Sequence, residues 1–283
     1  MGAYRGLTET IFPDIVAEAE AHNYSDANIL ILKGNKDEFV RRYPDTYNAI
    51  ISCFHNFDTR YPFEYARDLV ANWLLEDWIV KNLRERGIDI RLNGADKQRM
   101  ILFADRISGH SDTTVTIGGK KRDMEISANF TGYWQRTGKV DLRDNKYNNL
   151  RDNGCLLFGL DARNRKFFLL DVERMNNAVV HEEEHEAWGG KPCSSIILTP
   201  FDLAPFSFNA LEMRLREVFD HTPCEYYTEK NVTAPISQFR QGSLFMSTGV
   251  LVKEETTTVG MCLKSTDEEK CPFDGDKSRC EKV

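Results

Sequence analysis

The hydrophobic period of the chain changes at Ile88, from that of a helix to that of a strand. From Tyr61 to Arg86, apolar residues recur at steps of three and four, Pro62 suits a first helical turn and Gly87 a C-terminal cap. This stretch therefore predicts a long core helix. Beyond it, alternating apolar residues predict strands at 88–92, 100–103, 113–117, 120–130, 155–160, 167–172 and 195–198.

Helices followed by a sheet with helical insertions predict the fold class α/β, or α+β, with a mixed central β-sheet flanked by helices. Further helices are expected at 8–22, 36–54 and 208–219. The pattern weakens past His221. We therefore expect residues 1–220 to form a helical N-terminal region plus an α/β core, and residues 221–283 a C-terminal extension or small lobe.

The composition favours a soluble, cytoplasmic protein. No stretch approaches ~18 consecutive apolar residues, and the first residues lack the apolar core of a secretory signal. Seven cysteines without a CxxC pair argue against a disulfide framework. Cys262, Cys271 and Cys280 are the only grouped cysteines, and their wide spacing favours a polar tail over a zinc knuckle.

One segment is basic although the chain as a whole is acidic. The formal net charge is −7, yet residues 118–166 hold eleven Lys and Arg against six Asp and Glu, which leaves −12 on the rest. A local positive tract is typical of a phosphate-binding surface. The alternative is a solvated surface of mixed charge.

The strongest local signal is Gly118-Gly119, which predicts a β-hairpin with a two-residue turn. Paired positions then sum to 237, so Asp112 lies directly across from Glu125, and Asp123 shares their face. Clustered carboxylates repel one another, and a hard divalent cation such as Mg²⁺ would relieve the repulsion. The alternative is a solvated polar face with cross-strand pairs to Lys and Arg.

The hairpin resembles the core of the PD-(D/E)XK nucleases, a group that includes many type II restriction endonucleases. Asp112 matches the first acid of the motif, and Glu125 matches the second within Met124-Glu125-Ile126-Ser127. The third position, usually Lys, is Ser127 here. The resemblance covers roughly residues 61–200, where Glu76 of the long helix is placed to support the site.

The resemblance implies a Mg²⁺-dependent, sequence-specific endonuclease with a restriction-endonuclease-like core that cuts DNA and acts as a homodimer. Asp112 and Glu125 would hold the metal. Lys121 or Lys139 would supply the missing lysine, which orients water or stabilises the pentacovalent phosphate. Because Ser127 replaces that lysine, the alternative is a non-enzymatic module on the same scaffold that binds nucleic acid or protein.

Basic and aromatic residues around the hairpin are candidates for contacts to the nucleic acid. Basic side chains can grip phosphates and an aromatic ring can stack on bases, although Trp134 would equally suit a core position. The predicted residues are Lys120, Arg122, Trp134, Arg136, Arg143 and Lys146.

The segment His181-Glu182-Glu183-Glu184-His185 matches the HExxH pattern of zinc proteases. In those enzymes a helix carries both histidines, but here the segment is strongly acidic and Gly189-Gly190 soon interrupts it. We therefore expect a solvated acidic loop. A zinc hydrolase that uses His181, Glu182 and His185 is the less favoured alternative.

Overall fold

The computed structural model describes residues 2–54, 60–106, 111–185, 190–220, 227–235 and 254–262. The chain divides into two compact units, Met1–Arg216 and Glu217–Val283. Cys271 and Cys280 lie outside the described residues. No helix in the described ranges combines the length and the apolar character needed to cross a membrane.

The N-terminal part of the first unit is helical, as predicted. The long helix is confirmed, but the helices expected at 8–22 and 36–54 are each interrupted. The Asp14 side chain accepts a hydrogen bond from the Ala17 N–H and so starts a new helix, and Pro44 starts another. The helices are α1 (Ala3–Thr10), α2 (Ile15–Ala21), α3 (Asp26–Lys33), α4 (Lys36–Arg42), α5 (Pro44–Cys53) and α6 (Pro62–Glu85).

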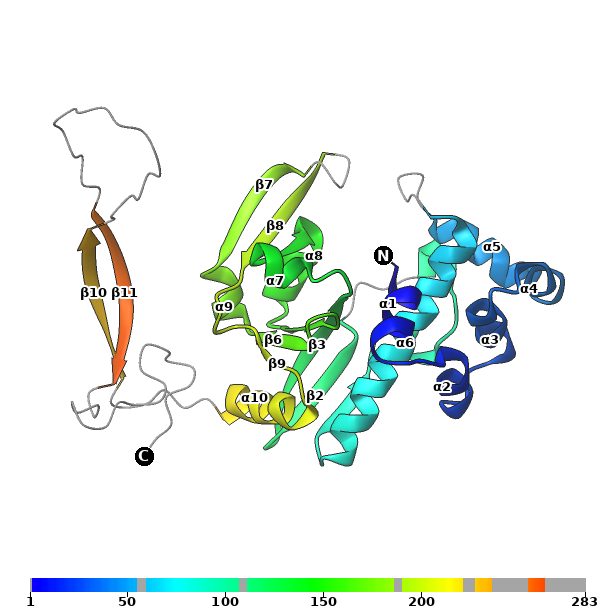
Figure 1. The fold of residues 1–283 in the computed structure, drawn as a ribbon, viewed down its shortest axis with the longest axis horizontal. Coiled ribbons are helices and arrows are strands. Elements are labelled where there is room, and N and C mark those ends of the chain that lie inside the picture. Colours follow the sequence, from blue (N-terminus) through cyan, green and yellow to red (C-terminus); the bar gives the residue numbers. More distant parts are fainter. Residues whose placement is uncertain are drawn as a thin grey trace. The chain divides into compact units, whose positions relative to one another are not determined.

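A mixed six-stranded sheet follows, so the predicted α/β class is confirmed (Figure 1). The β3–β5 pair is parallel and the other neighbouring strands are antiparallel. In spatial order the strands are β1 (Asp89–Leu92), β2 (Thr113–Ile117), β3 (Lys120–Asn129), β5 (Leu156–Asp161), β6 (Lys166–Leu170) and β9 (Ala204–Pro205).

The crossover from β3 to β5 carries two helices and one strand of a second, antiparallel sheet. Helices α7 (Tyr133–Thr137) and α8 (Asp144–Asp152) lie in this crossover, and α9 (Val172–Asn176) follows β6. The second sheet has the order β4 (Lys139–Arg143), β8 (Lys191–Ile197) and β7 (Val179–His185). Helix α10 (Phe208–Asp220) ends this region.

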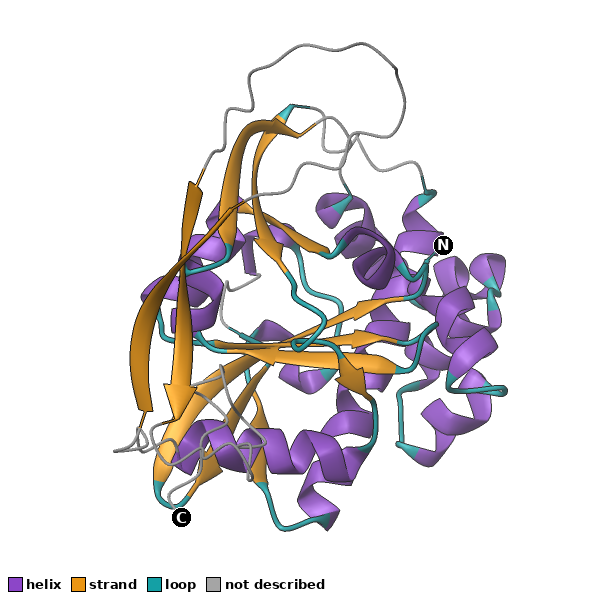
Figure 2. Ribbon diagram, turned by 60° about the vertical axis from the view of Figure 1, so that its left-hand side comes forward, coloured by secondary structure: helices purple, strands orange, loops and turns teal. Residues whose placement is uncertain are grey.

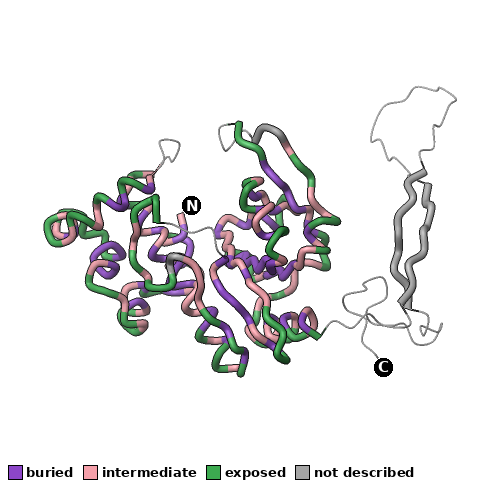
Figure 3. The backbone as a smooth tube through the Cα atoms, turned by 180° about the vertical axis from the view of Figure 1, so that it is seen from behind, coloured by how far each residue is buried: buried purple, intermediate pink, exposed green. Residues whose placement is uncertain are grey.

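The six-stranded sheet is covered on both faces (Figure 2). On one face, Leu157 and Phe168 pack with side chains of α7, α8, α9 and the second sheet. On the other face, Phe167 contacts Phe206, which in turn contacts Trp78 of α6. Every residue of β5 is buried, as expected for a strand between two layers (Figure 3).

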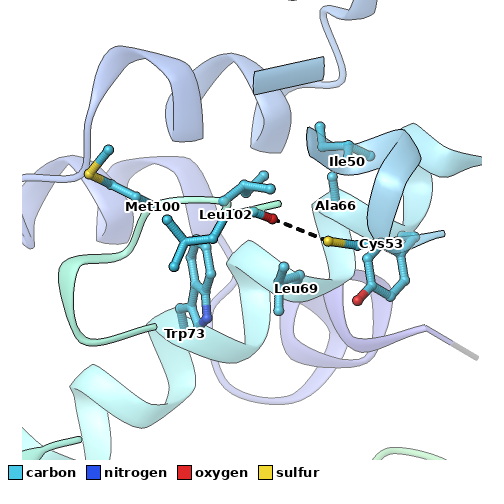
Figure 4. A pocket seen from close by; sticks show the side chains of 9 residues that line it. Ile50, Cys53, Ala66, Leu69, Trp73, Met100 and Leu102 are labelled. Carbon is cyan, nitrogen blue, oxygen red and sulfur yellow. Dashed lines mark hydrogen bonds between the residues drawn. The ribbon is translucent and has the colours of Figure 1, made fainter. Parts of the chain in front are cut away.

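The segment Met100–Phe103 is not a strand, so this prediction is wrong (Figure 4). It runs as an irregular strap across α5 and α6, where the Cys53 thiol donates a hydrogen bond to the Leu102 carbonyl (3.2 Å). The Ala104 N–H donates to the Ser52 hydroxyl (3.2 Å). Ile101 and Leu102 are therefore partly covered by helices, whereas Met100 and Phe103 remain exposed, and a small cavity of about 120 Å³ lies beneath the strap.

The second unit contains an antiparallel pair, β10 (Tyr227–Pro235) and β11 (Glu254–Cys262). In register, Tyr227 pairs with Cys262 and Pro235 with Glu254. This pairing comes from segments where no strand was predicted.

Candidate active site

The hairpin register matches the sequence prediction. Thr113 pairs with Met124 and Ile117 with Lys120, so each pair sums to 237. Gly118 and Gly119 have φ values of 57° and 76°, which a type I′ turn requires and glycine adopts without strain. Asp112 and Glu125 occupy the next opposed positions beyond the last regular pair.

The Asp112 carboxylate lies against β3, the strand that carries Glu125. Its Oδ2 accepts a hydrogen bond from the Ile126 N–H (2.7 Å), directly after Glu125. Burial raises the pKa of Asp112 well above its usual value, and the negative charges of Glu125 and Glu76 raise this pKa further. The Asp112 carboxylate, directly before β2, therefore interacts electrostatically with carboxylates from β3 and α6.

Lys146 of α8 provides the positive charge of this group. Its Nζ lies 2.5 Å from Glu125 Oε1, and the Glu125 side chain is 12% exposed. Burial opposes the charge on Lys146, but Glu125, with Asp112 and Glu76, outweighs that effect and raises the pKa of Lys146. The site is thus an ammonium among three carboxylates, which we call the hairpin cluster: Glu76, Asp112, Glu125 and Lys146.

Strand alternation explains how Lys146 reaches the hairpin. Glu125 pairs with Leu157 of β5, so both face the layer that contains α8. Tyr147 and Leu150 anchor α8 in the core of that layer, and Lys146, one helical turn before Leu150, is thereby placed beside Glu125. A residue 21 positions away in sequence is brought to Glu125 by the crossover.

Glu76 is held by a separate buried ion pair. Arg99 Nη1 lies 2.7 Å from Glu76 Oε2, and Arg99 Nη2 lies 2.7 Å from Asp77 Oδ1. Tyr24 donates a hydrogen bond to Asp77 Oδ2 (2.6 Å). Arg99 therefore fixes the carboxylate of Glu76, whose charge acts on Asp112 of the hairpin cluster.

Asp123, the third predicted carboxylate, does not join the cluster. Its Oδ1 accepts a hydrogen bond from the Thr114 hydroxyl (2.6 Å) and another from Asn93 Nδ2 (3.4 Å). These partners hold it within the sheet face, further toward the turn.

The two lysines proposed as replacements for the motif lysine lie elsewhere. Lys121 is exposed opposite Thr116, near the turn, about 13 Å along the strand from Glu125 at roughly 3.3 Å per residue. Lys139 lies in the second sheet and pairs with Glu182 (3.7 Å). Lys146 was predicted to contact nucleic acid, and only the packing of α8 reveals that it lies beside Glu125.

The residues predicted to contact nucleic acid lie in three different environments. Trp134 is 6% exposed and packs edge-on against Phe168, so it belongs to the core and the prediction that it stacks on bases is wrong. Lys120 and Arg122 alternate with Glu125 along β3 and so lie toward the opposite face of the sheet. Arg136 and Arg143 are exposed, and Arg143 lines the same pocket as Glu125 and Lys146.

The HExxH segment lies in strand β7, not in the expected loop. Its neighbour is β8 alone, so β7 is an edge strand, where charged residues are tolerated because one side meets solvent. In a zinc protease, both histidines lie one turn apart on the same face of a helix and bind one metal ion. In a strand, His181 and His185 are too far apart along the chain for this arrangement.

A serine, a histidine and an aspartate also meet on the second sheet. Ser194 Oγ donates to Asp144 Oδ1 (2.5 Å) and lies 2.9 Å from His181 Nδ1. The serine stands between the other two and is fully buried. A hydrolytic triad instead needs the histidine between an accessible serine and the acid, so this group is structural.

The donor set of the hairpin cluster suits Mg²⁺ better than zinc. Among the described residues, no three or more Asp, Glu, His or Cys side chains form a complete metal site. Mg²⁺ does not need one, because it commonly binds one or two carboxylates and takes its other ligands from water and substrate phosphate. Asp112 and Glu125 are the carboxylates that could hold it, and their mutual repulsion favours a bound cation.

The raised pKa of Asp112 predicts how stability depends on pH. Because folded Asp112 keeps its proton to higher pH than unfolded Asp112, the stability of the wild type falls as pH rises from about 4 through the raised pKa. Asp112→Asn does not titrate. We expect its melting temperature to exceed that of the wild type by an amount that grows with pH and vanishes below about pH 4.

Thermal unfolding between pH 4 and pH 8 measures this difference. Mg²⁺ should raise the melting temperature of the wild type but not that of the variant. A difference that stays constant with pH would contradict the electrostatic description of the cluster.

Neither protein-family models nor curated proteins give a match to this sequence. The functional assignment therefore rests on the chemistry of the hairpin cluster and of the surface around it.

Proposed function

We propose that the protein is a Mg²⁺-dependent endonuclease that hydrolyses phosphodiester bonds in DNA, with the hairpin cluster as its active site. The observation that carries the proposal is the convergence of Asp112, Glu125 and Lys146 from a hairpin and its crossover helix. Two carboxylates and an ammonium form the minimal set for holding a cation against a phosphate. The two carboxylates are those that the resemblance to PD-(D/E)XK nucleases implies, whereas the proposed lysine is Lys146 of α8 instead of Lys121 or Lys139.

The residues of the cluster have different roles in this proposal. Asp112 and Glu125 hold the metal, which when bound lowers the pKa of water and neutralises charge on the cleaved phosphate. The raised pKa of Lys146 keeps it an ammonium at neutral pH. Lys146 therefore donates hydrogen bonds and positive charge to the phosphate, and it does not accept a proton from the attacking water. Glu76 is held in place by Arg99. Its negative charge helps to retain both the metal ion and the Lys146 ammonium.

The second candidate is a module on the same scaffold that binds nucleic acid without cutting it. Ser127 in place of the motif lysine favours this candidate, whereas Lys146 beside Glu125 favours the enzyme. Incubation of DNA with the protein and Mg²⁺ separates the two, because only the enzyme yields shorter products. Sequence-specific cleavage and a homodimer are also part of the proposal; discrete product bands and sedimentation would test them.

The charge around the site predicts the salt dependence of DNA binding. Arg143 is exposed at the N-terminal end of α8, beside the hairpin cluster. Since each phosphate contact releases counterions, Arg143→Ala should lower the slope of log affinity against log salt by about one unit. Binding should be measured in Ca²⁺ so that DNA is not consumed.

Arg151→Ala is the matched control. Arg151 lies on α8, which begins directly after Arg143, but it pairs with Asp152 (2.9 Å), so its loss should change the slope less. An unchanged slope in Arg143→Ala would contradict a phosphate contact at this residue.

The HExxH segment predicts a negative result. Because β7 is an edge strand, His181→Ala with His185→Ala should leave bound metal and nuclease activity largely unchanged. Elemental analysis after dialysis and a cleavage assay measure both. Stoichiometric zinc in the wild type that the double variant loses would instead favour a zinc hydrolase.

A further inference from the structure

A pocket of about 320 Å³ lies directly beside the hairpin cluster. Glu125 and Lys146 form the part of its wall that belongs to the candidate active site. The remaining lining residues are Ser111, Arg143, Asn145, Asn149, Leu150 and Cys155. At this volume the pocket is at the low end for small-molecule sites, which span roughly 300–1,000 Å³.

The strongest sign of a ligand is a buried hydroxyl in the wall. Ser111 is 7% exposed, and its buried Oγ has no hydrogen-bond partner among the residues that the structure describes. Burial raises the pKa of the nearby Cys155 thiol and Ser111 acts to lower it, but the Ser111 Oγ does not meet hydrogen-bond geometry with this thiol. Buried polar groups almost always form a hydrogen bond. We therefore expect a ligand in the pocket to form a hydrogen bond with the Ser111 hydroxyl.

The outer wall carries further polar groups without partners. Within the described residues, neither the Asn145 amide nor the Arg143 guanidinium makes a side-chain hydrogen bond or ion pair, and both are exposed. An amide offers a donor and an acceptor together, which suits the edge of a nucleobase, whereas a guanidinium suits a phosphate.

The floor of the pocket is apolar. Leu150 and Cys155 are each 3% exposed. Burial is the main cause of the raised pKa of Cys155, so its thiol stays uncharged at neutral pH. A neutral floor, an amide wall and a cationic rim together match a nucleotide better than a bare anion, which would leave the floor uncovered.

We propose that this pocket takes one nucleotide of the bound strand, turned out of the base stack beside the cleaved phosphate. Its base lies on Leu150 and Cys155, with its polar edge toward Ser111 and Asn145, and its phosphate meets Arg143. Enzymes that extrude a nucleotide in order to modify its base read that base by hydrogen bonds to its polar edge and by packing against apolar side chains, the two kinds of contact that this pocket offers. This inference rests on the proposed nuclease function, because that function brings DNA to Lys146.

Calorimetric titration of the full chain with the four deoxynucleoside 5′-monophosphates, in EDTA, tests the pocket without requiring catalysis. Deoxyribose 5-phosphate and inorganic phosphate are the controls for an anion site. We expect at least one nucleotide to bind at least about tenfold more tightly than either control. No nucleotide binding, or equal binding of the phosphates that lack a base, would overturn the proposal.

Matched variants connect binding to the pocket. Asn145→Ala and Ser111→Ala should each weaken nucleotide binding by about tenfold, while Asn148→Ala, on the same helix but outside the lining, should not. Ser111→Ala should not lower the melting temperature, because its hydroxyl has no partner to lose. Equal weakening by Asn148→Ala would contradict the assignment.

The two proposals fail separately. Cleavage of DNA without nucleotide binding would overturn the pocket and keep the nuclease. Nucleotide binding that needs Ser111 and Asn145, in a protein that cuts no nucleic acid, would support the pocket and overturn the nuclease.

Discussion

Glu125→Gln and Asp112→Asn should each reduce DNA cleavage by about three orders of magnitude or more. Both variants keep the shape of the side chain and remove the charge that would hold the cation, whose effect on a phosphoryl transition state amounts to several kcal/mol. Glu125 is also the carboxylate that pairs with Lys146 (2.5 Å), so Glu125→Gln also removes the ion-pair partner of Lys146. Initial rates on a labelled duplex in Mg²⁺ measure the loss.

Asp123→Asn is the control for these variants. Asp123 lies on the same hairpin face but bonds to Thr114 and Asn93 rather than joining the cluster, so we expect cleavage close to that of the wild type. A Glu125→Gln protein that melts normally and cuts at nearly the wild-type rate would remove the hairpin cluster from the mechanism.

Lys146→Met should lower cleavage by about 10²- to 10³-fold, the range seen when one preorganised donor to a transition state is removed. Lys146→Arg keeps the positive charge and should restore part of the rate. The pKa of Asp112 should rise further in Lys146→Met, because Lys146 is the positive charge that lowers it in the wild type. The pH at which half of the residual activity is lost should therefore move upward in this variant.

Lys121→Met and Lys139→Met distinguish this assignment from the one based on sequence. Lys121 lies near the turn and Lys139 pairs with Glu182, so neither change should affect the chemical step. A large loss of the single-turnover rate in either variant, with Lys146→Met unaffected, would return the motif lysine to one of those positions.

Local signals predicted the part of the site that depends on neighbouring residues. Gly118-Gly119 determines the turn type, and the turn determines the register that brings Asp112 opposite Glu125. The long helix α6 was equally clear because its apolar period continues from a proline to a glycine. Asp14 and Pro44 are also local signals for the start of a helix, and helices α2 and α5 do begin there. The longer helices predicted at 8–22 and 36–54 did not take these signals into account.

The remaining parts depend on packing between distant segments. Lys146 reaches Glu125 only because Tyr147 and Leu150 pack α8 against the layer that Glu125 faces, which no local pattern reveals. Met100–Phe103 has the apolar pattern of a strand, but it finds helices instead of a strand as neighbours. Trp134 shows the same limit, since an aromatic residue in a basic tract suits a surface and a core equally well in sequence.

The most direct test of the central claim is the digestion of assorted DNA molecules by the wild-type protein in Mg²⁺, with EDTA and Glu125→Gln as parallel controls. The proposed function predicts shorter products that require both Mg²⁺ and the Glu125 carboxylate. DNA that stays intact with Mg²⁺, or that is cut equally well in EDTA or by Glu125→Gln, would contradict it.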